Sequence, residues 1–448
     1  MPATPPRPAE NPAGLKIVAD ATCAGCGCAC DDIELSVQGD QIVAATRACA
    51  LGEAWFFEQP SADRPSCTLA GRPATVAEGV ERAAQILAAA RYPLVYGLVD
   101  TTCEAQRVAA SIADWIGGTI DTPTSSKHGP GGVSFQGVGE VTCSLGEMAN
   151  RGDMIIVWGA DPVVSQPRHF ERYSLQPQGM FVPGGRRDRT LVVIDVERTA
   201  SAAAADIFLQ IKRGQDFEAL WTLRALAQGL PLDAGVVEHQ TGVPLATWQD
   251  LMQRMMQARF GVFLFGQGLT MTSGRYLNAE ALVALVRDMN AHTRFAAQPL
   301  RAGGNGAGAD SVLLWRTGYP FGVNLSRGYP RFNPGEYTAQ EVLARGEADA
   351  ALLVGGDPLA EFAGPARAAL ETIPLVAIAS RDTATARAAA VAFTTARYGI
   401  HTAGTVYRMD DVPLPLRPAL HSPHPSDVAV LAAIEARVRK LKAIGCGL

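Results

Sequence analysis

Short runs of apolar residues recur along the chain, and stretches with helical periodicity lie between them. Helices are predicted over residues 76–90, 103–117 and 275–289. The apolar runs are rich in Val, Ile and Leu and have the length of strands that helices cover on both faces. Strands and helices alternate, which predicts an α/β fold with parallel sheets. The predicted strands are residues 93–97, 154–159, 191–195, 263–266, 350–356 and 375–379.

The first 60 residues follow a different pattern. Residues 33–37 alternate apolar and polar side chains, Gly39 and Asp40 make a turn, and residues 41–44 resume the strand character. This pattern predicts a β-hairpin within a small β-rich module, preceded by a mostly apolar run over residues 15–19. Residues 1–12 are rich in Pro and Ala and lack the apolar core of a signal peptide, so we expect a loose arm there.

Two strand ends resemble each other. Residues 157–162 and 354–358 each run from an apolar strand through glycine into Asp-Pro. Loops at the carboxyl ends of parallel strands are where α/β sheets bind nucleotides, although two similar strand ends without a ligand fit the pattern equally well. Residues 302–308 contain four glycines but neither a Walker lysine nor a G-x-G-x-x-G order. For that segment we favour a flexible loop over a site of close backbone approach.

Composition narrows the class of protein. The chain has 448 residues, of which 48% are hydrophobic, enough for two to four domains with buried cores. Its net charge of −5, from 39 basic and 44 acidic residues, gives no reason to expect binding to nucleic acid or to an anionic membrane. No apolar run approaches the roughly 18–20 residues of a membrane helix. Without an export signal we expect a cytoplasmic protein with reduced thiols.

The cysteines carry the clearest chemical signal. Four of the nine lie within eight residues, and the spacing Cys23-x2-Cys26-x3-Cys30-x18-Cys49 offers four thiolates, one of them remote. This is the ligand pattern of a [4Fe-4S] cluster, with Cys28 left over. A structural zinc site or buried thiols without metal remain open alternatives. The isolated cysteines are expected to be core or surface thiols: Cys67, Cys103, Cys143 and Cys446.

Several motifs together resemble the molybdenum/tungsten-pterin oxidoreductases, and most closely the B subunit of formylmethanofuran dehydrogenase. They are the Cys23–Cys30 segment with Asp-Asp-Ile after it, Ser-Ser-Lys-His-Gly-Pro at 125–130, residues 157–162 with Pro-Arg-His at 167–169, and residues 404–410. The resemblance implies a cysteine-cluster module at residues 1–60, an α/β domain from 61–135 with 295–448, and an inserted α/β domain at 136–294, without a C-terminal barrel. It also implies that Gly159, Asp161, Gly356 and Asp357 lie in loops that approach a bis-pterin guanine dinucleotide.

Two residues depart from this family pattern. Active members carry a metal-binding cysteine or selenocysteine immediately before His-Gly-Pro, where this chain has Lys127. An ammonium has no lone pair to offer a cationic metal. Members related to formate dehydrogenase carry a basic residue before the glycine of Cys-x-Lys-Gly, where this chain has Leu51. Both departures argue against a working redox path, so a molybdenum or tungsten bis-pterin cofactor is not expected.

The resemblance then favours a non-redox relative, the B subunit of the bacterial formyltransferase/hydrolase complex of methylotrophs. In such a complex, the A subunit is a metal-dependent hydrolase that releases formate, and the D subunit transfers formyl between tetrahydromethanopterin and a methanofuran-like carrier. Together with the C subunit, these are the expected partners, and this chain is expected to be a scaffold without redox catalysis of its own. The alternatives are the catalytic subunit of a Mo/W-pterin formylmethanofuran or formate dehydrogenase, and an iron–sulfur electron carrier.

The remaining candidates receive plainer interpretations. No catalytic residue is assigned, and the family's active-site position corresponds to Lys127 and His128, for which a structural or surface role is favoured. Arg168 and His169 are expected in a loop, where they contact an anion or are solvated. Asp410 is expected to have a structural role. No H-x-H or H-E-x-x-H pattern occurs among the seven histidines, so hydrolytic metal chemistry is expected on a partner chain.

Overall fold

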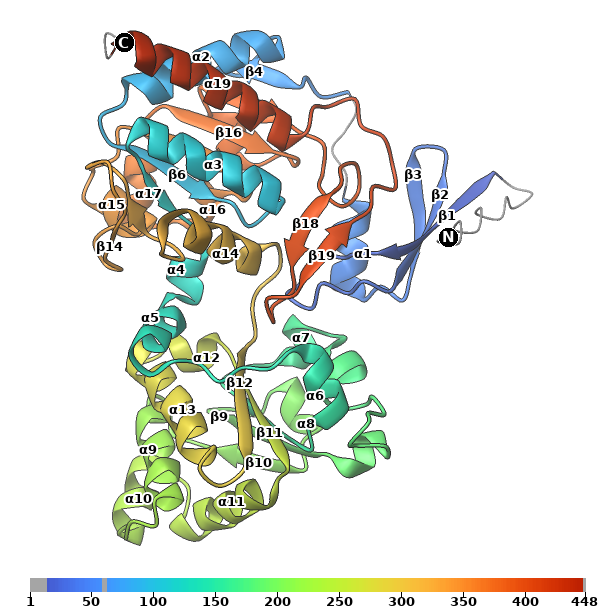
Figure 1. The fold of residues 1–448 in the computed structure, drawn as a ribbon, viewed down its shortest axis with the longest axis vertical. Helices are drawn as coiled ribbons and strands as arrows, with labels where there is room; N and C mark the ends of the chain where they lie inside the picture. Colours follow the sequence, from blue (N-terminus) through green and yellow to red (C-terminus); the bar gives the residue numbers. More distant parts are fainter. Residues whose placement is uncertain (1–13, 59–62, 446–448) are drawn as a thin grey trace, which may run out of the picture. The chain divides into compact units, whose positions relative to one another are not determined.

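The computed structural model describes residues 14–58 and 63–445, and the chain divides into two units (Figure 1). Unit 1 comprises Met1–Ser126, Gly303–Arg408 and Pro413–Leu448, and unit 2 comprises Lys127–Ala302 with Met409–Val412. The predicted arm over residues 1–12 and Cys446 lie outside the described residues. The main segment of unit 2 runs from Lys127 to Ala302, and the inserted domain at 136–294 that the family resemblance implies stays a prediction.

A mixed sheet with the strand order β14-β13-β7-β6-β15-β16-β17-β4-β5 forms the middle of unit 1. Its five central strands are parallel, and the flanking strands pair antiparallel. The central strands are β7 (Thr119–Asp121), β6 (Pro93–Gly97), β15 (Ala350–Val354), β16 (Leu375–Ala379) and β17 (Val391–Thr394). The flanking strands are β13 (Val323–Asn324), β14 (Arg331–Phe332), β4 (Cys67–Leu69) and β5 (Arg72–Pro73).

Helices cover both faces of this sheet, as continuous apolar strands require. Side chains of β6 alternate between the two cores, with Val95 on one face and Leu94 and Tyr96 on the other. Figure 1 shows α19 beside α2 and α3 on the first face. That face carries α2 (Val76–Ala89), α3 (Cys103–Ile116), α14 (Gly306–Thr317) and α19 (Asp427–Gly445), and the other carries α15 (Ala339–Ala344), α16 (Pro358–Glu361), α17 (Gly364–Leu370) and α18 (Ala384–Ala388).

Local sequence signals set the helix ends. Thr75 and Glu78 form a capping box at the start of α2, which satisfies two backbone N–H groups that the helix leaves unpaired. Thr102 caps α3, and Gly117 ends it in the left-handed conformation. These signals explain why the predicted helices over 76–90 and 103–117 agree with the structure to within one residue.

The predicted hairpin is also present in unit 1. Strands β1 (Leu15–Ala21), β2 (Ile33–Gln38) and β3 (Gln41–Thr46) form an antiparallel sheet in that order, and helix α1 (Ala50–Phe57) follows. A two-stranded ribbon, β18 (Gly404–Tyr407) with β19 (Pro413–Leu416), was not predicted. Prolines in β19 lower its strand propensity, and only the long-range pairing with β18 fixes it.

Unit 2 contains a parallel five-stranded sheet of order β10-β9-β8-β11-β12. Trp158 and Phe263 are fully buried in its core. The strands are β8 (Met154–Trp158), β9 (Thr190–Asp195), β10 (Ile207–Gln210), β11 (Phe260–Phe265) and β12 (Arg294–Pro299), and the long helices are α5 (Gly129–Val138), α9 (Asp216–Ala227), α10 (Ala234–Thr241), α11 (Leu245–Gln257) and α13 (Tyr276–Met289). Short helices are α4 (Thr124–Lys127), which bridges the unit boundary, α6 (Leu145–Arg151), α7 (Pro162–Ser165), α8 (Ala200–Ala203), α12 (Gln267–Thr270), the π-helix η1 (Phe170–Ser174) and the 3-10 helix η2 (Gly185–Asp188). The predicted α/β class with parallel sheets is confirmed.

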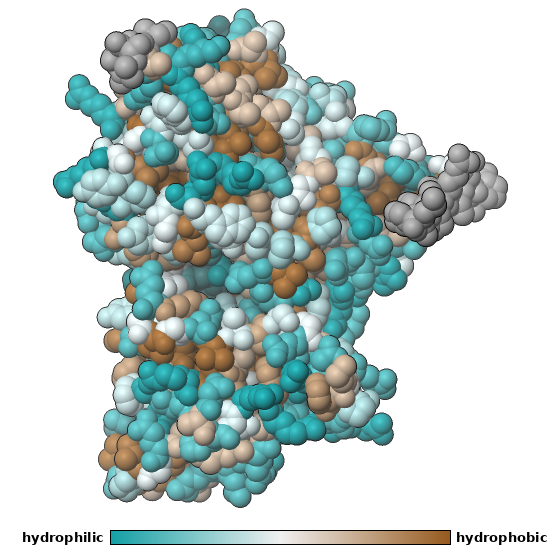
Figure 2. Space-filling model, in the orientation of Figure 1, coloured by the Kyte–Doolittle hydropathy of each residue, from teal (hydrophilic) through white to brown (hydrophobic). Residues whose placement is uncertain are grey.

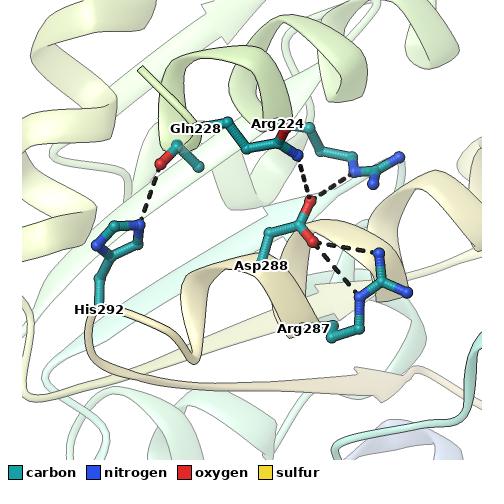
Figure 3. Close-up of polar contacts among 6 residues, drawn as sticks. Arg224, Gln228, Arg287, Asp288 and His292 are labelled. Atoms are coloured by element: carbon teal, nitrogen blue, oxygen red, sulfur yellow. Dashed lines mark hydrogen bonds and ion pairs between the residues drawn. The ribbon is translucent and has the colours of Figure 1, made fainter. Parts of the chain in front are cut away.

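A polar cluster joins the ends of α9 and α13 (Figure 3). Arg224 Nε donates to Asp288 Oδ2 at 2.8 Å, and the two side chains are only 10% and 13% exposed. The Arg287 guanidinium approaches the other Asp288 oxygen at 3.2 Å. Nearby, the His292 Nε2 and the carbonyl oxygen of Ala227 are 3.0 Å apart. These contacts add polar links between α9 and α13 to the apolar core that the two helices share.

The glycine-rich segment requires a correction. Residues 306–308 are not a loop but the first turn of α14. A Cβ at Gly308 would lie 2.1 Å from Oδ1 of Asn305, and Asn305 is fully buried. Tertiary contacts of Asn305, which no local pattern reports, therefore start this helix. Gly303 and Gly304, in contrast, are sites of close backbone approach.

Hydrophobic and hydrophilic residues are interspersed on the face drawn in Figure 2. Among residues 14–58 and 63–445, no helix combines the length and the apolar character needed to cross a bilayer.

Candidate functional site

The cysteine quartet is divided between the loop that joins β1 to β2 and the residue before α1. In the loop between β1 and β2, the Cys23 N–H donates to the Cys30 carbonyl at 2.8 Å and the Ala29 N–H donates to the Cys26 carbonyl at 3.1 Å. Cys49 precedes α1 in an extended conformation. Cys23, Cys26 and Cys30 are buried, and Cys49 is partly exposed.

Two glycines allow the loop to contact the start of α1. A Cβ at Gly25 would lie 2.7 Å from the carbonyl oxygen of Leu51. A Cβ at Gly52 would lie 3.2 Å from Sγ of Cys23 and 4.0 Å from Sγ of Cys49. Any side chain at either glycine therefore pushes the loop away from the helix that carries the fourth thiol.

The other three thiols of the quartet act on Cys23. Burial raises the pKa of Cys23 well above its ordinary range, the Gly25 N–H opposes this by donating to Sγ, and Cys26, Cys30 and Cys49 raise it further. The Cys23 thiol therefore stays protonated until a cation compensates the charge of its thiolate. The cysteines that act on Cys23 are thus the other three members of the quartet that the sequence spacing predicts.

The donor set of the quartet is compatible with an iron–sulfur cluster or with zinc. Four sulfur ligands without oxygen or nitrogen suit iron–sulfur clusters and zinc. Within the described residues, no three His, Cys, Asp or Glu side chains converge on one point as the ligands of a single metal ion do. A cubane cluster binds each cysteine through a different iron and so takes sulfurs that lie farther apart than those around zinc. Such a cluster would supply one-electron transfer.

A cavity of about 550 Å³ within unit 1 lies beside the quartet. Gly25 and Leu51 line it, together with the loops after β6 and β15. On its wall the Arg381 guanidinium pairs with Asp100 and lies 3.4 Å from the Glu58 carboxylate. The coulombic pull of Asp100 raises the pKa of Arg381 further above its ordinary value, so this ion-pair group stays charged at all physiological pH values.

Asp357, one of the proposed cofactor-loop residues, borders this cavity but is engaged by its own fold. Its carboxylate accepts hydrogen bonds from the N–H groups of Ala384 and Thr385, both at 2.9 Å, and from the Thr385 hydroxyl at 2.5 Å. Burial acts to raise the pKa of Asp357, but these hydrogen bonds outweigh it and hold the pKa below its ordinary value. Gly356 precedes it with φ of 74°, a conformation that favours glycine.

Asp161 has the corresponding contacts in unit 2. Its carboxylate accepts from the N–H groups of Ala200 and Ser201, both at 3.0 Å, and from the Ser201 hydroxyl at 2.5 Å. Gly159 has φ of 56°, and a Cβ there would lie 2.5 Å from the backbone nitrogen of Leu269. Glycine is thus required at this strand end by packing alone, whatever the loop binds.

Lys127 and His128 lie at the start of unit 2. Lys127 is exposed at the end of α4, and His128 caps α5. Burial, the Arg301 guanidinium and the Lys127 ammonium together lower the pKa of His128 to about 3. Its buried Nε2 has no hydrogen-bond partner among the described residues. His128 is therefore a neutral imidazole flanked by two cations.

Arg168 and His169 are not solvated, contrary to one of the two interpretations of their loop. Arg168 is 7% exposed and His169 is fully buried at the start of the π-helix η1. The His169 Nδ1 and the Ser174 hydroxyl oxygen are 2.9 Å apart. Burial lowers the pKa of His169 to about 4, with a smaller opposing effect of Asp410. Asp410 itself accepts from the Leu145 N–H at 2.6 Å, a structural contact at the start of α6.

Comparison with known proteins decides the family. The chain is 39% identical over 416 residues to the B subunit of tungsten-containing formylmethanofuran dehydrogenase 2 from Methanocaldococcus jannaschii, covering 91% of this chain and 95% of that protein. It is 35% identical to the same subunit from Methanococcus maripaludis, over 96% of this chain and 100% of that protein. The chain belongs to the B-subunit family of formylmethanofuran dehydrogenases.

More distant members of this family include the B subunit of the formyltransferase/hydrolase complex Fhc from Methylorubrum extorquens, 28% identical over 64% of this chain and 74% of that protein. The crystal structure of that FhcABCD complex with methylofuran matches 84% of this chain and 99% of its own chain, with a TM-score of 0.70 and 25% identity. Acetylene hydratase from Pelobacter acetylenicus shares the fold, with a TM-score of 0.66 and 11% identity over 94% of this chain and 69% of its own. A scan against protein-family models finds no match.

These relatives confirm the predicted resemblance to the B subunits of formylmethanofuran dehydrogenases and the molybdopterin-oxidoreductase-like fold. Of the isolated cysteines, which were expected to be core or surface thiols, Cys67, Cys103 and Cys143 are buried.

Three functional candidates were missed by sequence reasoning. Arg301 lowers the pKa of His128. The two residues lie near opposite sequence ends of the main segment of unit 2, and only the fold brings them close. Asp100 and Arg381 line the cavity of unit 1. Both follow predicted strands, so the rule that ligands bind at the carboxyl ends of parallel strands would have found them.

Proposed function

We propose that this chain is the core B subunit of a formyl-transferring complex and performs no tungsten- or molybdenum-dependent oxidation itself. Lys127 is the observation that carries the proposal, since the family resemblance places a metal-binding cysteine or selenocysteine there. Hydrolysis of the formyl group and its transfer between carriers belong, in this proposal, to the partner A and D subunits, and the C subunit is a further partner.

The electrostatic environment of Lys127 supports this proposal. Arg301 and Lys127 both place positive charge near His128. A high-valent metal at the same place would add a third cation, and the ammonium has no lone pair with which to bind it. Like charges at one site repel one another, and this repulsion disfavours a third cation there.

The proposed role of the chain is to hold partner active sites at a fixed separation. A formyl carrier that travels on an arm reacts efficiently only if both sites lie within its reach, because effective concentration falls steeply when a tether cannot span the gap. The two α/β units and the cysteine module would be retained for their surfaces.

A second candidate function is a tungsten-dependent formylmethanofuran dehydrogenase subunit with an altered metal environment. Identity is higher to the tungsten enzymes, at 39% and 35%, than to the B subunit of Fhc, at 28%. The intact quartet of Cys23, Cys26, Cys30 and Cys49 also favours electron transfer. This candidate requires one tungsten or molybdenum atom per chain.

The deciding experiment is elemental analysis of the complex purified anaerobically from its native host through a tag on this chain. We expect less than about 0.1 W or Mo per chain and co-purification of a hydrolase and a formyltransferase. One W or Mo per chain would contradict the proposal and establish the second candidate. Iron or zinc measured on the same sample reports separately on the quartet.

The Lys127→Cys variant gives a matched comparison. If the redox site has been lost through several changes, the variant gains no metal and the complex keeps its formyl-transfer activity. Uptake of tungsten by the variant but not by the native chain would show that Lys127 alone blocks the site, which also supports the proposal for the native chain.

A further inference from the structure

A surface loop of unit 2 displays two large apolar side chains, those of Met180 and Phe181, which are 78% and 46% exposed. Their backbone N–H groups donate to Asn150, at 3.2 Å and 2.9 Å. Asn150 lies in α6, which precedes β8, so the loop lies at the amino end of the parallel sheet. Gly159 and Asp161 follow β8 at the opposite end. The loop is therefore separate from the residues that the family resemblance places near a cofactor.

A buried arginine fixes this loop. Arg189 is 4% exposed, and its guanidinium donates to backbone carbonyls of two segments. Two of these carbonyls belong to the chain that enters the loop and two to the end of α6: Leu175, Pro177, Ala149 and Gly152. Burying a guanidinium is unfavourable unless its N–H groups are paired. Because Arg189 pairs them with both segments, the loop has a defined conformation before any partner binds.

The residues on either side of the exposed pair are also fixed. A Cβ at Gly179 would lie 2.3 Å from the Ala149 carbonyl oxygen, and Val182 is fully buried. Gly179 and Val182 exchange two backbone hydrogen bonds, at 3.1 Å and 3.2 Å. Met180 and Phe181 are thus the tip of a closed turn. A preformed apolar tip loses little conformational entropy when a partner covers it, and Met and Phe are enriched at interfaces between proteins.

Arginine side chains border this tip. The Arg151 guanidinium lies 4.7 Å from the centroid of the Phe181 ring and pairs with Glu147 at 3.7 Å. On the other side, Arg259 Nη2 donates to the Phe181 carbonyl at 3.1 Å. Arg259 also pairs with Asp153, but the Arg259 side chain is 66% exposed and that of Asp153 only 13%. The charge that this ion pair presents to solvent is therefore positive.

We propose that Met180 and Phe181 insert into an apolar cleft of another subunit of the complex, with carboxylates of that subunit facing Arg259. This inference rests on the proposed function, since the partner belongs to the same complex. A second copy of this chain does not fit, because a twofold contact sets the same patch against itself and would bring its arginines together. An apolar centre with a charged rim is the usual composition of a protein interface.

Photo-crosslinking in the assembled complex tests the proposal. The probe p-benzoylphenylalanine replaces Met180 in the tagged chain, and mass spectrometry identifies the peptide that it captures. We expect a peptide of another subunit that contains Asp or Glu beside apolar residues. The same probe at Val236, which is 52% exposed on α10, is the matched control and should not capture that peptide. A crosslink to a second copy of this chain, or none from position 180 in an intact complex, overturns the proposal.

Two substitutions give an independent measurement of the same contact. Met180→Ser should raise the apparent Kd for the captured subunit about tenfold, measured by dissociation of the complex on dilution. Arg259→Gln should raise it about threefold, and more at low salt, whereas Val236→Ser should leave it unchanged. Circular dichroism of each variant separates loss of the contact from loss of the fold. An unchanged Kd in both Met180→Ser and Arg259→Gln contradicts the proposal.

The metal content of the same complex keeps this inference separable from the proposed function. A complex without W or Mo that gives no crosslink from position 180 would refute the interface alone. One W or Mo per chain together with the expected crosslink would refute the proposed function and leave the interface in place.

Discussion

Asp161 and Asp357 occupy equivalent positions in two different sheets and make the same three hydrogen bonds. Each follows a parallel strand that ends in glycine, precedes a proline at the start of a short helix, and accepts from two backbone N–H groups and one hydroxyl of a second helix. The hydroxyl belongs to Ser201 in unit 2 and to Thr385 in unit 1. The same hydroxyls accept from Val163 and Leu359. The resemblance that the sequence shows between these strand ends is therefore a repeated structural device.

This repetition predicts matched losses of stability. Asp161→Asn and Asp357→Asn each leave N–H donors facing an amide, and each should lower the free energy of unfolding by about 1–3 kcal/mol. Urea unfolding followed by circular dichroism measures both. Asp40→Asn, in the exposed β2–β3 turn, is the control and should change stability by less than about 0.5 kcal/mol. Loss in one loop without loss in the other would show that the two devices are not equivalent.

The cysteine quartet predicts that Gly25 is indispensable for metal binding. Gly25→Ala places a methyl group 2.7 Å from the Leu51 carbonyl oxygen, a contact that only a shift of the backbone can relieve. If the quartet holds iron, this variant should lose more than about half of it, because thiolate distances must stay within a few tenths of an ångström. Iron and visible absorbance are measured on anaerobic protein.

Gly137→Ala provides the control for this experiment. A Cβ at Gly137, in α5, meets no atom within 4 Å, so iron content should stay unchanged. Full iron content in Gly25→Ala would show that the metal lies elsewhere.

His169 predicts acid sensitivity. Burial lowers its pKa to about 4 in the folded chain, below the unfolded value of about 6.5. The neutral form is the one that fits the fold, so its contribution to stability is complete above pH 6.5 and is lost as the pH falls toward about 4. His169→Gln should reduce the fall in melting temperature between pH 7 and pH 5. His239→Gln, at an exposed position of α10, should leave the slope of the wild type, and an unchanged slope in His169→Gln would contradict the assignment.

The polar cluster of Arg224, Arg287 and Asp288 in Figure 3 predicts that removal of one charge lowers the stability of the chain strongly. Arg224→Met leaves the nearly buried Asp288 with Arg287 at 3.2 Å and the Gln228 amide at 3.4 Å, and should destabilise the chain by about 3 kcal/mol in urea unfolding. The double variant Arg224→Met with Asp288→Leu removes both charges and should recover at least half of this loss. Additive losses would show that the two residues do not interact.

Much of the fold could be predicted because its strands are continuous apolar runs. Residues 93–97 and 375–379 are strands β6 and β16 with no change of boundary, since every residue of each is buried. The start of α14 could not be predicted. The Asn305 side-chain amide donates to the backbone carbonyls of Thr101 and Thr405, and both residues are remote in sequence.

Part of the candidate site could likewise be predicted from the sequence, and part could not. The spacing of Cys23, Cys26, Cys30 and Cys49 predicted that these cysteines act on one another, and the other three do act on Cys23; the metal that they would bind stays a prediction. Arg301 could not be linked to His128, since the interaction depends on where β12 ends relative to α5. The burial of His169 was likewise hidden, because a polar residue after proline carries no local sign of the π-helix that encloses it.

The glycines around the quartet have a consequence for how the chain can be divided. A Cβ at Gly303 would lie 2.5 Å from the Gly25 carbonyl oxygen, and the Gly304 N–H donates to the Ala24 carbonyl at 3.0 Å. The cysteine loop is thus enclosed by α1 on one side and by residues some 280 positions later on the other. Residues 14–58 therefore depend on later parts of unit 1 for their packing, and a metal site in them would form only once the rest of unit 1 has folded.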